Sequence, residues 1–185
     1  MDKSAAISIL RRLLGALWFG SIAAVVCLAV ATNVGPKLGF EVFAIRGGSM
    51  APAIPLGAAI VAAHTATDDI VVGDLVTIRA QNGVIYTHRV VEIDASETEH
   101  WLRTKGDANT TADGAPVPAS SVVGVVEVTI PLVGFLIGLL STPVGVVSFL
   151  AYAIALLGAI WELEEAEDAT ATDRRPARSP DVARA

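Results

Sequence analysis

The sequence predicts a mainly β protein, in which a small antiparallel β-domain is flanked by transmembrane helices. Apolar residues make up 53% of the 185 residues. They are concentrated in residues 13–36 and 128–161, neither of which contains a charged side chain. Between these segments, short β-branched runs are separated by Gly, Pro and Asp, a pattern typical of strands and turns. We therefore expect the folded domain in residues 37–130.

Residues 1–36 are expected to form a cytoplasmic N-terminus and a transmembrane anchor. A bilayer core takes roughly 20 apolar helical residues to cross, and Leu13–Thr32 meets this length. Ala29-Val30-Ala31 resembles a signal cleavage site, but the apolar core of a cleaved signal has only about 7–15 residues. The length therefore favours an uncleaved anchor. Three basic side chains precede it: Lys3, Arg11 and Arg12. This positive flank places the N-terminus in the cytoplasm and the β-domain outside.

Six strands are expected in residues 37–130, where about 90 residues suffice for one hydrophobic core. They are Glu41–Ile45, Ala58–Ala63, Asp74–Arg79, Val84–Ile93, Glu99–Lys105 and Ser121–Ile130. Turn residues such as Gln81-Asn82-Gly83 and Asp113-Gly114 separate them. No segment of useful length in this region has the period of a helix, so the pairing is expected to be mostly antiparallel.

Residues 131–161 are expected to form a membrane-surface segment and a second transmembrane helix. Gly and Pro interrupt residues 131–142, whereas residues 144–161 are continuously apolar and end at Trp161, an aromatic residue suited to the membrane interface. Residues 162–185 combine acidic residues, Pro and Arg with few bulky apolar side chains. This composition is typical of a disordered segment, here a cytoplasmic tail.

Charge and cysteine usage exclude several classes of function. The net charge is −6, and the sequence shows no basic face with interleaved aromatic residues, so nucleic-acid binding is not expected. The single cysteine, Cys27, cannot form an intrachain disulfide and is interpreted as a packing or lipid-facing residue. The three histidines have no zinc-ligand spacing. No metal or other cofactor is implied.

Two segments carry residues suited to nucleophilic catalysis. Ser49 follows two glycines at the end of an expected strand, and glycines allow a substrate backbone to approach closely. His88 lies in the strand-like run Tyr86-Thr87-His88-Arg89-Val90. A serine hydroxyl needs a base to take its proton, and neutral imidazole suits this task near pH 7. Taken singly, these residues also fit a Gly-Ser turn and a packed histidine. His64 and His100 are interpreted as incidental.

A carboxylate could act as a third group beside the serine and the histidine. Asp107 and Asp113 lie in and after the segment Thr104-Lys105-Gly106-Asp107-Ala108-Asn109. A carboxylate that accepts from the second histidine nitrogen fixes the tautomer and stabilises the imidazolium. Either residue could do this, and either could instead be a turn residue.

The anchor is followed along the chain by the segment of Ser49, the segment of His88 and the segment of Asp107 and Asp113. This ordered set resembles the type I signal peptidases, specifically the endoplasmic-reticulum and archaeal-type branch that uses serine and histidine. The resemblance covers about residues 10–160 and includes Val72-Gly73-Asp74 as a strand start. It implies Ser49 as nucleophile, His88 as base, and Asp113 as the favoured third member, with Asp107 supporting the loop or the histidine. Other members of the superfamily use a lysine base. None of the three lysines occupies that position: Lys3, Lys37 and Lys105.

The resemblance further implies a membrane-bound serine endopeptidase that removes signal peptides from secreted or membrane pre-proteins through an acyl-enzyme. Expected partners are these pre-proteins, the lipid bilayer and the secretion machinery. The expected location is the cell membrane, as a multi-pass protein with an extracytoplasmic catalytic domain. Some relatives have a serine at the position of Gly47 that helps to hold the oxyanion, and losing one such donor costs on the order of 3 kcal/mol. Backbone N–H groups, including that of Ser49, would then hold the oxyanion.

The substrate pocket is expected to be shallow and lined by small apolar side chains. Candidate lining residues, which could equally belong to the core, are Val42, Ala44, Ile45, Val84 and Tyr86. The alternative function is a non-catalytic membrane-anchored assembly or accessory protein whose β-domain binds a secreted partner. A narrower alternative keeps the chemistry but restricts the substrates to a few dedicated proteins, such as fibre or pilus subunits.

Overall fold

The computed structural model describes residues 3–95 and 100–173. Seven strands are present in this part of the chain: β1 Phe40–Ala44, β2 Ala59–Ala63, β3 Leu75–Arg79, β4 Ile85–Ala95, β5 His100–Lys105, β6 Val117–Pro118 and β7 Val122–Ile130. The α-helices are α1 Lys3–Val34, α2 Val133–Leu140 and α3 Pro143–Asp173. Three short 3₁₀ helices are Gly35–Leu38, Thr67–Asp69 and Ala119–Ser121.

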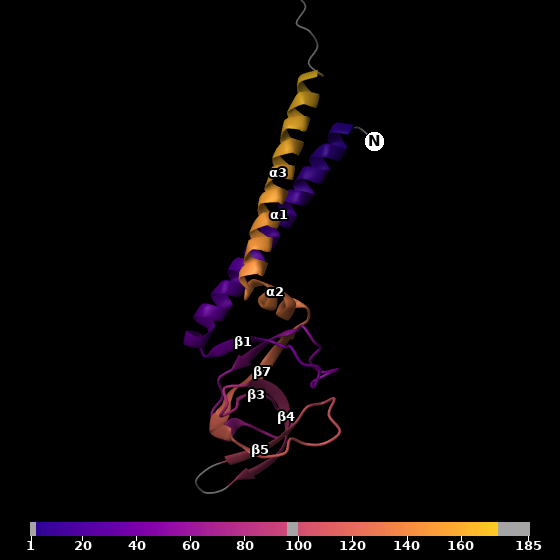
Figure 1. The fold of residues 1–185 in the computed structure, drawn as a ribbon. Helices are drawn as coiled ribbons and strands as arrows, with labels where there is room; N and C mark the ends of the chain where they lie inside the picture. The colour runs from indigo at the N-terminus through magenta and orange to yellow at the C-terminus, as the bar shows by residue number, and fades with distance from the viewer. Residues whose placement is uncertain (1–2, 96–99, 174–185) are drawn as a thin grey trace, which may run out of the picture. The chain divides into compact units, whose positions relative to one another are not determined.

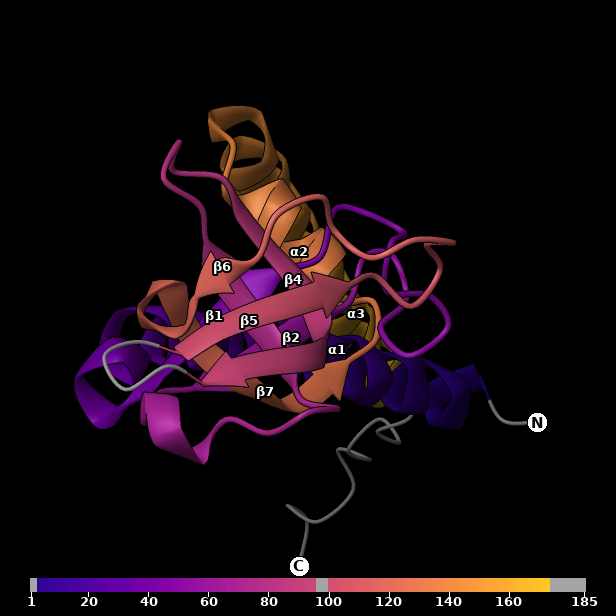
Figure 2. The ribbon, with the colours of Figure 1, turned by 90° about the horizontal axis from the view of Figure 1, so that it is seen from below.

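The strands form one curled sheet with the order β1-β2-β7-β3-β4-β5-β6 (Figures 1 and 2). Every neighbouring pair is antiparallel. The last strand, β7, lies between β2 and β3, and so joins the first hairpin to the remaining strands. The prediction of a mainly β protein with an antiparallel domain and flanking helices is confirmed.

The six predicted strands correspond to β1–β5 and β7, and each predicted end that falls on a described residue lies within two residues of the observed one. The predicted start of the fifth strand, Glu99, lies outside the described residues. The prediction missed β6, which consists of Val117 and Pro118 and pairs with Leu102 and Trp101 of β5. A two-residue strand has no alternation to detect, and Pro is confined to edge strands because it has no N–H to donate. β6 is such an edge strand.

Two clusters of buried side chains form the interior of the β-domain. One lies between β3, β4 and β5 and contains Ile70, Val76, Ile78, Val90, Leu102 and Ala119. The other lies beneath β1 and β2 and contains Met50, Ile54, Ala58 and Ile60. Met50 is only 2% exposed, so the residue directly after Ser49 is anchored in the core. Because truncating a buried Met to Ala costs about 2–5 kcal/mol, this anchor fixes the adjacent backbone strongly.

Helix α2 occupies the segment that was expected at the membrane surface. It contacts β1 and β2 through a close approach of backbone to backbone: a Cβ added to Gly134 would lie 2.2 Å from the Ala58 carbonyl oxygen. Gly57 has φ +78° and faces the ring of Phe135, so it needs glycine for both space and conformation. Three apolar side chains of this segment remain largely exposed: Leu132, Phe135 and Leu139.

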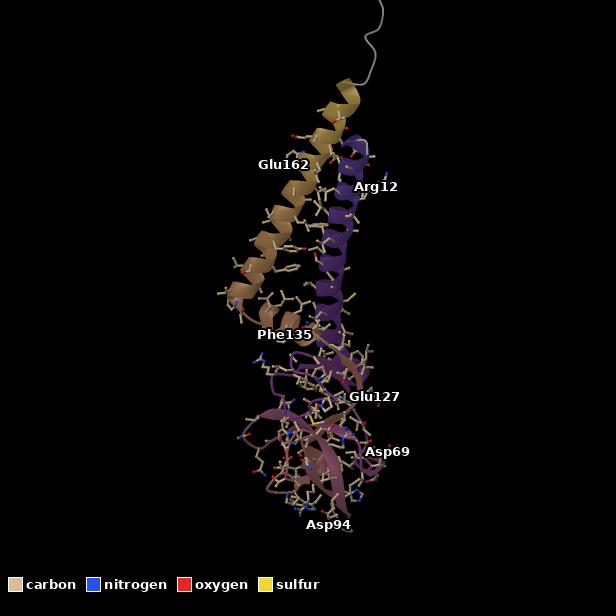
Figure 3. All side chains as sticks on the ribbon, turned by 90° about the vertical axis from the view of Figure 1, so that its right-hand side faces the viewer. Arg12, Asp69, Asp94, Glu127, Phe135 and Glu162 are labelled. Atoms are coloured by element: carbon tan, nitrogen blue, oxygen red, sulfur yellow. The ribbon has the colours of Figure 1, made fainter. Side chains whose placement is uncertain are left out.

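The first part of α1, up to Val26, forms a compact unit with α3, separate from the unit formed by Cys27–Pro143. Within the helical unit, the Trp18 Nε1–H donates to the Ala153 carbonyl oxygen at 3.1 Å. Residues Ala5–Leu38 and Pro143–Thr170 are long and apolar enough to cross a membrane. Figure 3 shows their mostly apolar side chains, with the charged residues Arg12 and Glu162 labelled.

Helix α3 continues through Asp173, so the prediction of a disordered segment from residue 162 is wrong for residues 162–173. Glu, Leu and Ala, which have high helix propensity, dominate this stretch. Arg11 of α1 also pairs with Glu164 and Glu167, at N–O distances of 3.5 and 3.0 Å. The rest of the predicted tail, residues 174–185, lies outside the described residues.

Candidate active site

Ser49 lies in the turn that follows β1. The Ala51 N–H donates to the Gly48 carbonyl oxygen at 3.1 Å, which closes a tight turn around the serine. The side chain of Met50 is buried on the inner side of this turn, while Ser49 is half-buried. A Cβ added to Gly47 or Gly48 would meet no atom within 4 Å. Neither glycine is therefore required by internal packing, and both leave open space beside the hydroxyl.

His88 lies on β4 and directs its Nε2 toward Ser49. The Nε2–Oγ distance is 3.2 Å, within hydrogen-bond reach. The His88 side chain is 12% exposed, and its ring packs edge-on against the ring of Tyr86, with 5.2 Å between the centroids. This packing agrees with the alternation expected for β4, which places residues 86 and 88 on one face. The sheet thus holds the imidazole in one orientation.

Asp113 is the carboxylate that contacts His88. Its Oδ2 lies 2.6 Å from the His88 Nδ1. The same oxygen accepts a hydrogen bond from the Thr104 hydroxyl, also at 2.6 Å. The Asp113 N–H in turn donates to the Thr104 carbonyl oxygen at 2.8 Å. Thr104 is fully buried, so Asp113 is fixed to the end of β5 through both its side chain and its backbone.

Asp107 contacts a different residue of β4. Its two carboxylate oxygens accept from the Nε and NH2 atoms of Arg89 at 2.8 and 2.7 Å. The Arg89 NH1 donates to the Gly73 carbonyl oxygen at 2.8 Å. The hydrogen bonds from Arg89 lower the pKa of Asp107 below its usual value, with burial acting in the opposite direction. The same pairing raises the pKa of Arg89. Asp107 is therefore a fixed negative charge at neutral pH.

The loop that carries Asp107 also contacts the backbone of Ser49. The Ala108 N–H donates to the Ser49 carbonyl oxygen at 2.8 Å. A Cβ added to Gly106 would lie 2.7 Å from that same oxygen and 3.0 Å from the Ser49 Cβ. Since real Cβ atoms do not approach backbone so closely, only glycine fits at position 106. The Arg89–Asp107 pair thereby holds a loop that positions the serine.

A cavity of about 540 Å³ opens beside Ser49. Four of the five predicted lining residues contribute to it: Val42, Ala44, Ile45 and Tyr86. The fifth, Val84, is not among the lining residues and is 54% exposed. Apart from Ser49, the remaining lining residues were missed by the prediction: Phe43, Arg46, Gly47, Met50, Ile85, Thr87 and Ile137. Burial raises the pKa of the Tyr86 phenol, and the Asp113 carboxylate adds to this, while a hydrogen bond with Thr104 acts in the opposite direction.

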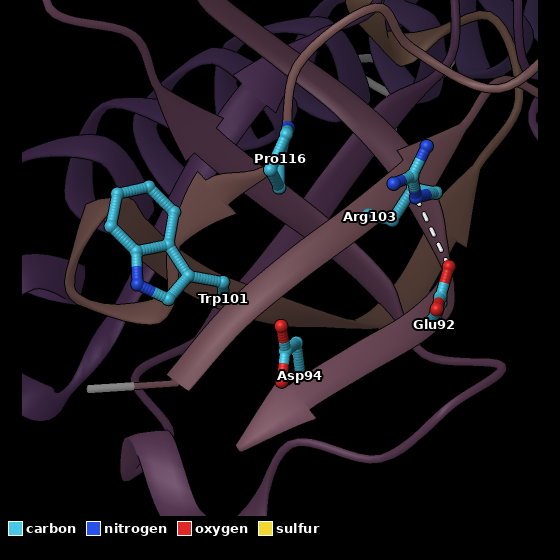
Figure 4. Close-up of a pocket in the computed structure, with 5 residues that line it drawn as sticks. All are labelled: Glu92, Asp94, Trp101, Arg103 and Pro116. Carbon is cyan, nitrogen blue, oxygen red and sulfur yellow. Dashed lines mark ion pairs between the residues drawn. The ribbon is translucent and has the colours of Figure 1, made fainter. Parts of the chain in front are cut away.

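A second cavity, of about 390 Å³, lies over β4 and β5 and contains none of the predicted site residues (Figure 4). Trp101 and Pro116 lie on one side of it, and the Arg103 Nε pairs with a Glu92 oxygen at 3.0 Å on the other. The remaining histidines, His64 and His100, lie 3.5 and 3.7 Å from carboxylate oxygens of Glu41 and Asp68. Among the described residues, no three His, Cys, Asp or Glu side chains converge to hold a metal ion.

The arrangement links a hydroxyl, an imidazole and a carboxylate in one hydrogen-bonded chain. With a proton on Nδ1 of His88, Nε2 can accept the proton of Ser49 Oγ while Asp113 stabilises the resulting imidazolium. The sequence did not indicate Thr104 as part of this chain, because a threonine in a strand is ordinary. Only the alternation of side chains along β5 could have indicated Thr104. Leu102 and Thr104 both point into the core, and a buried hydroxyl needs a hydrogen-bond partner.

Comparison with known proteins gives one informative similarity. No protein-family model matches the chain. Over 85 residues it is 32% identical to signal peptidase I W of Bacillus subtilis (strain 168). The aligned residues make up 45% of this chain and 45% of the relative, so the chain spans less than half the length of the curated protein it matches. The similarity supports a relationship to the signal peptidase I family and, at that level, to peptidases.

Proposed function

We propose that this chain is a membrane-anchored serine endopeptidase that removes signal peptides from secreted or membrane pre-proteins, with the serine–histidine chemistry of the endoplasmic-reticulum and archaeal-type branch. The observation that carries the proposal is the hydrogen-bonded chain from Ser49 Oγ through His88 to Asp113, with contacts of 3.2 and 2.6 Å. The similarity to signal peptidase I W of Bacillus subtilis supports the choice of substrate class.

In the first half of the proposed reaction, Ser49 Oγ attacks the carbonyl carbon of the scissile peptide bond while its proton moves to His88 Nε2. Asp113 stabilises the imidazolium that forms. Because Gly47 has no side-chain hydroxyl, the oxyanion depends on backbone N–H groups, including that of Ser49. His88 then donates its proton to the leaving amine, and the N-terminal part of the substrate remains as an ester on Ser49.

In the second half, water attacks the ester. His88 takes the proton of the water and returns it to Ser49 Oγ as the ester bond breaks. The released signal peptide has a free carboxyl terminus, and the hydroxyl is regenerated. Asp107 takes no part in proton transfer in this scheme. Its role is to hold the loop of Gly106 against the Ser49 backbone.

The proposed location is the cell membrane, with the two long apolar helices as spans and the β-domain on the extracytoplasmic side. Exposed apolar side chains on α1 and α3, such as Phe19 at 70% and Ile154 at 70%, support contact with lipid. The pre-protein substrates are themselves inserted in the membrane through an apolar segment. They are therefore the partners that such a location favours, along with the secretion machinery that delivers them.

The test is precursor processing combined with labelling by an active-site-directed serine acylating reagent. Ser49→Ala and His88→Ala should each abolish cleavage of a pre-protein with an Ala-x-Ala cleavage site, while both variants still insert into the membrane. Ser121→Ala is the matched control, since the Ser121 hydroxyl donates to the Pro118 carbonyl oxygen and lies outside the chain of contacts. Labelling should map to Ser49. Cleavage by the Ser49→Ala protein would refute Ser49 as the nucleophile, whereas a wild type that neither cleaves nor reacts with the reagent would favour the non-catalytic binding role.

A further inference from the structure

Arg46 is a charged residue in an otherwise uncharged cavity. The described residues that line the cavity beside Ser49 are apolar or neutral, with this one exception. The lining comes from β1, from the turn that follows it, from β4 and from Ile137 of α2. A substrate that enters to reach Ser49 therefore meets one positive charge and no compensating negative charge in the cavity wall.

Of the four arginines of the β-domain, Arg46 and Arg79 have no ion pair with a described residue, and only Arg46 lines the cavity beside Ser49. Arg89 and Arg103 form ion pairs with Asp107 and Glu92. In the part of the chain that the structure describes, the guanidinium of Arg46 has no ion pair and no hydrogen bond to another residue, and the side chain is exposed. Its five N–H donors are consequently available to a ligand, and a guanidinium matches a carboxylate in a bidentate geometry.

We propose that Arg46 selects substrates that carry an acidic side chain close to the scissile bond. This inference rests on the proposed function, because it assumes that a peptide bond lies at Ser49. Pairing with Arg46 would orient the peptide in a cavity whose other walls are apolar and provide little directional contact. Arg46 is thus a specificity-determining residue and takes no part in proton transfer.

The distance along the chain limits where the acidic residue can be. Two residues, Gly47 and Gly48, lie between Arg46 and Ser49, so three Cα-to-Cα steps place the two Cα atoms at most ~11 Å apart. An extended substrate advances roughly 3.3 Å per residue. This Cα separation corresponds to about three substrate residues before the reach of the two side chains is added. The acidic residue is therefore expected a few positions from the bond that is cleaved, on one side of it.

A peptide is a better partner for Arg46 than an anionic lipid headgroup on the present geometry. The side chain lines the same cavity as the Ser49 hydroxyl, and that cavity must be open to the substrate for the proposed reaction. A headgroup in this position would compete with the substrate for the cavity. We therefore commit to the acidic peptide and make the lipid an outcome of the experiment.

The experiment uses the full-length protein in phosphatidylcholine vesicles and a set of model precursors with one Ala-x-Ala site. Each precursor carries a single Asp, Asn or Lys at one of four positions on either side of the scissile bond. At the responsive position, the wild-type kcat/KM should be about fivefold higher for Asp than for Lys, which corresponds to the upper range of an exposed ion pair. Raising the ionic strength from roughly 0.05 to 0.5 M should reduce this preference, because salt screens exposed charges.

Two substitutions at Arg46 and one elsewhere complete the design. Arg46→Gln should remove the preference, and Arg46→Glu should invert it, so that Lys is favoured over Asp. Arg103→Gln is the matched control, because Arg103 lines the cavity over β4 and β5 and not the one beside Ser49. It should retain the wild-type preference.

Binding to the Ser49→Ala protein separates this inference from the proposed function. Fluorescence anisotropy of the same labelled precursors measures the charge preference without requiring cleavage. If the Ser49→Ala protein binds Asp and Lys precursors equally at every position, or if Arg46→Glu does not change their ratio, the inference is overturned even where the wild type cleaves. If charge preference is present but the wild type cleaves nothing, the proposed function fails and the inference about recognition stands.

The lipid arm repeats the assay in vesicles that contain phosphatidylglycerol. A pairing of Arg46 with the peptide predicts that Arg46→Glu inverts the Asp-to-Lys ratio in both kinds of vesicle. If Arg46→Glu instead changes cleavage of all precursors by the same factor, and only in the anionic vesicles, Arg46 contacts headgroups and the inference is overturned.

Discussion

Two carboxylates on the chain that follows β5 each pair with a neighbouring residue of β4, and the two pairs differ in what they can do. Asp113 contacts His88, whose imidazole can gain and lose a proton near neutral pH and whose other nitrogen faces Ser49. Asp107 contacts Arg89, whose guanidinium stays charged at any physiological pH. The first pair is suited to move a proton, whereas the second can only hold the backbone in place.

The comparison shows why a charged pair near a serine is not sufficient to assign a catalytic role. Both carboxylates accept short hydrogen bonds from β4, and both lie close to the turn of Ser49. The identity of the partner separates them, because only a titratable partner connected to the hydroxyl can act in acid–base chemistry. Three predictions test this division of roles.

The largest effect is expected from Asp113→Asn. An amide in place of the carboxylate removes the charge that stabilises the imidazolium and allows the wrong tautomer of His88, which lowers kcat on the order of 10⁴-fold in a serine protease triad. We expect a loss of roughly 10³–10⁴-fold in kcat/KM for precursor cleavage.

Asp107→Asn is the matched variant for this measurement, since it makes the same chemical change in the same loop. It should retain activity within about tenfold of the wild type, because it weakens the position of Ser49 and leaves the proton path intact. A larger loss for Asp107→Asn than for Asp113→Asn would reverse the assignment of the two carboxylates.

An intermediate effect is expected from Thr104→Val, which removes a buried hydroxyl with little change in volume. The Thr104 hydroxyl donates to the same Asp113 oxygen that faces His88, so its loss should lower kcat about tenfold, the equivalent of one hydrogen bond to a charged group. KM should change less than kcat, because the hydroxyl is buried and reaches the substrate cavity only through its hydrogen bond with Tyr86. Thr104→Ser, which keeps the donor, should recover most of the activity.

Active-site titration and a double-mutant cycle separate this positioning role from simple destabilisation. Rates are expressed per titrated serine, so that unfolded protein does not contribute. In the Asp113→Asn background, Thr104→Val should cost no more than about twofold. Full additivity of the two substitutions would show that Thr104 does not act through Asp113.

The smallest effect concerns the stability that Asp107 contributes. The Arg89 hydrogen bonds lower the pKa of Asp107, so its contribution is present above the unfolded-state pKa of about 3.9 and is lost as pH falls through the lower folded-state value. Urea unfolding at pH 7 should show Asp107→Asn to be less stable by about 1 kcal/mol, as for a partly exposed ion pair. The difference from wild type should persist down to about pH 5 and shrink below about pH 4. A difference that grows on acidification would contradict the pairing.

Much of the fold could be predicted because its determinants are local. The alternation of apolar and polar residues, together with the turn residues, predicted β1–β5 and β7. Long segments without charged residues predicted the two long helices. The strand β6 could not be found, because it is defined by pairing with β5 and not by its own two residues. The helical extension to Asp173 could not be predicted from hydrophobicity, because this charged stretch lacks the apolar face of a packed helix. Ion pairs such as Arg11–Glu167 support it instead.

The sequence predicted which residues could form the candidate site, but not the contacts that support them. Ser49, His88 and the two aspartates were indicated by their motifs, and the structure brings Ser49, His88 and Asp113 together. The supporting contacts were not predictable from local pattern. The close approach of Gly106 to the Ser49 carbonyl oxygen and the hydrogen bond from Thr104 both depend on how distant segments pack.

Because His88 and Arg89 are adjacent on β4, the active site depends on the correct pairing register of this strand. Successive side chains of a strand point to opposite faces, so a slip of one residue in the pairing of β4 would exchange the two positions. Arg89 would then lie toward Ser49, where a guanidinium cannot serve as a base. The register shift between β4 and β5 falls between Val90 and Glu92, just beyond this pair. The same slip would move Val90 out of the core. A mispaired β4 would therefore cost both core packing and reaction with an acylating probe.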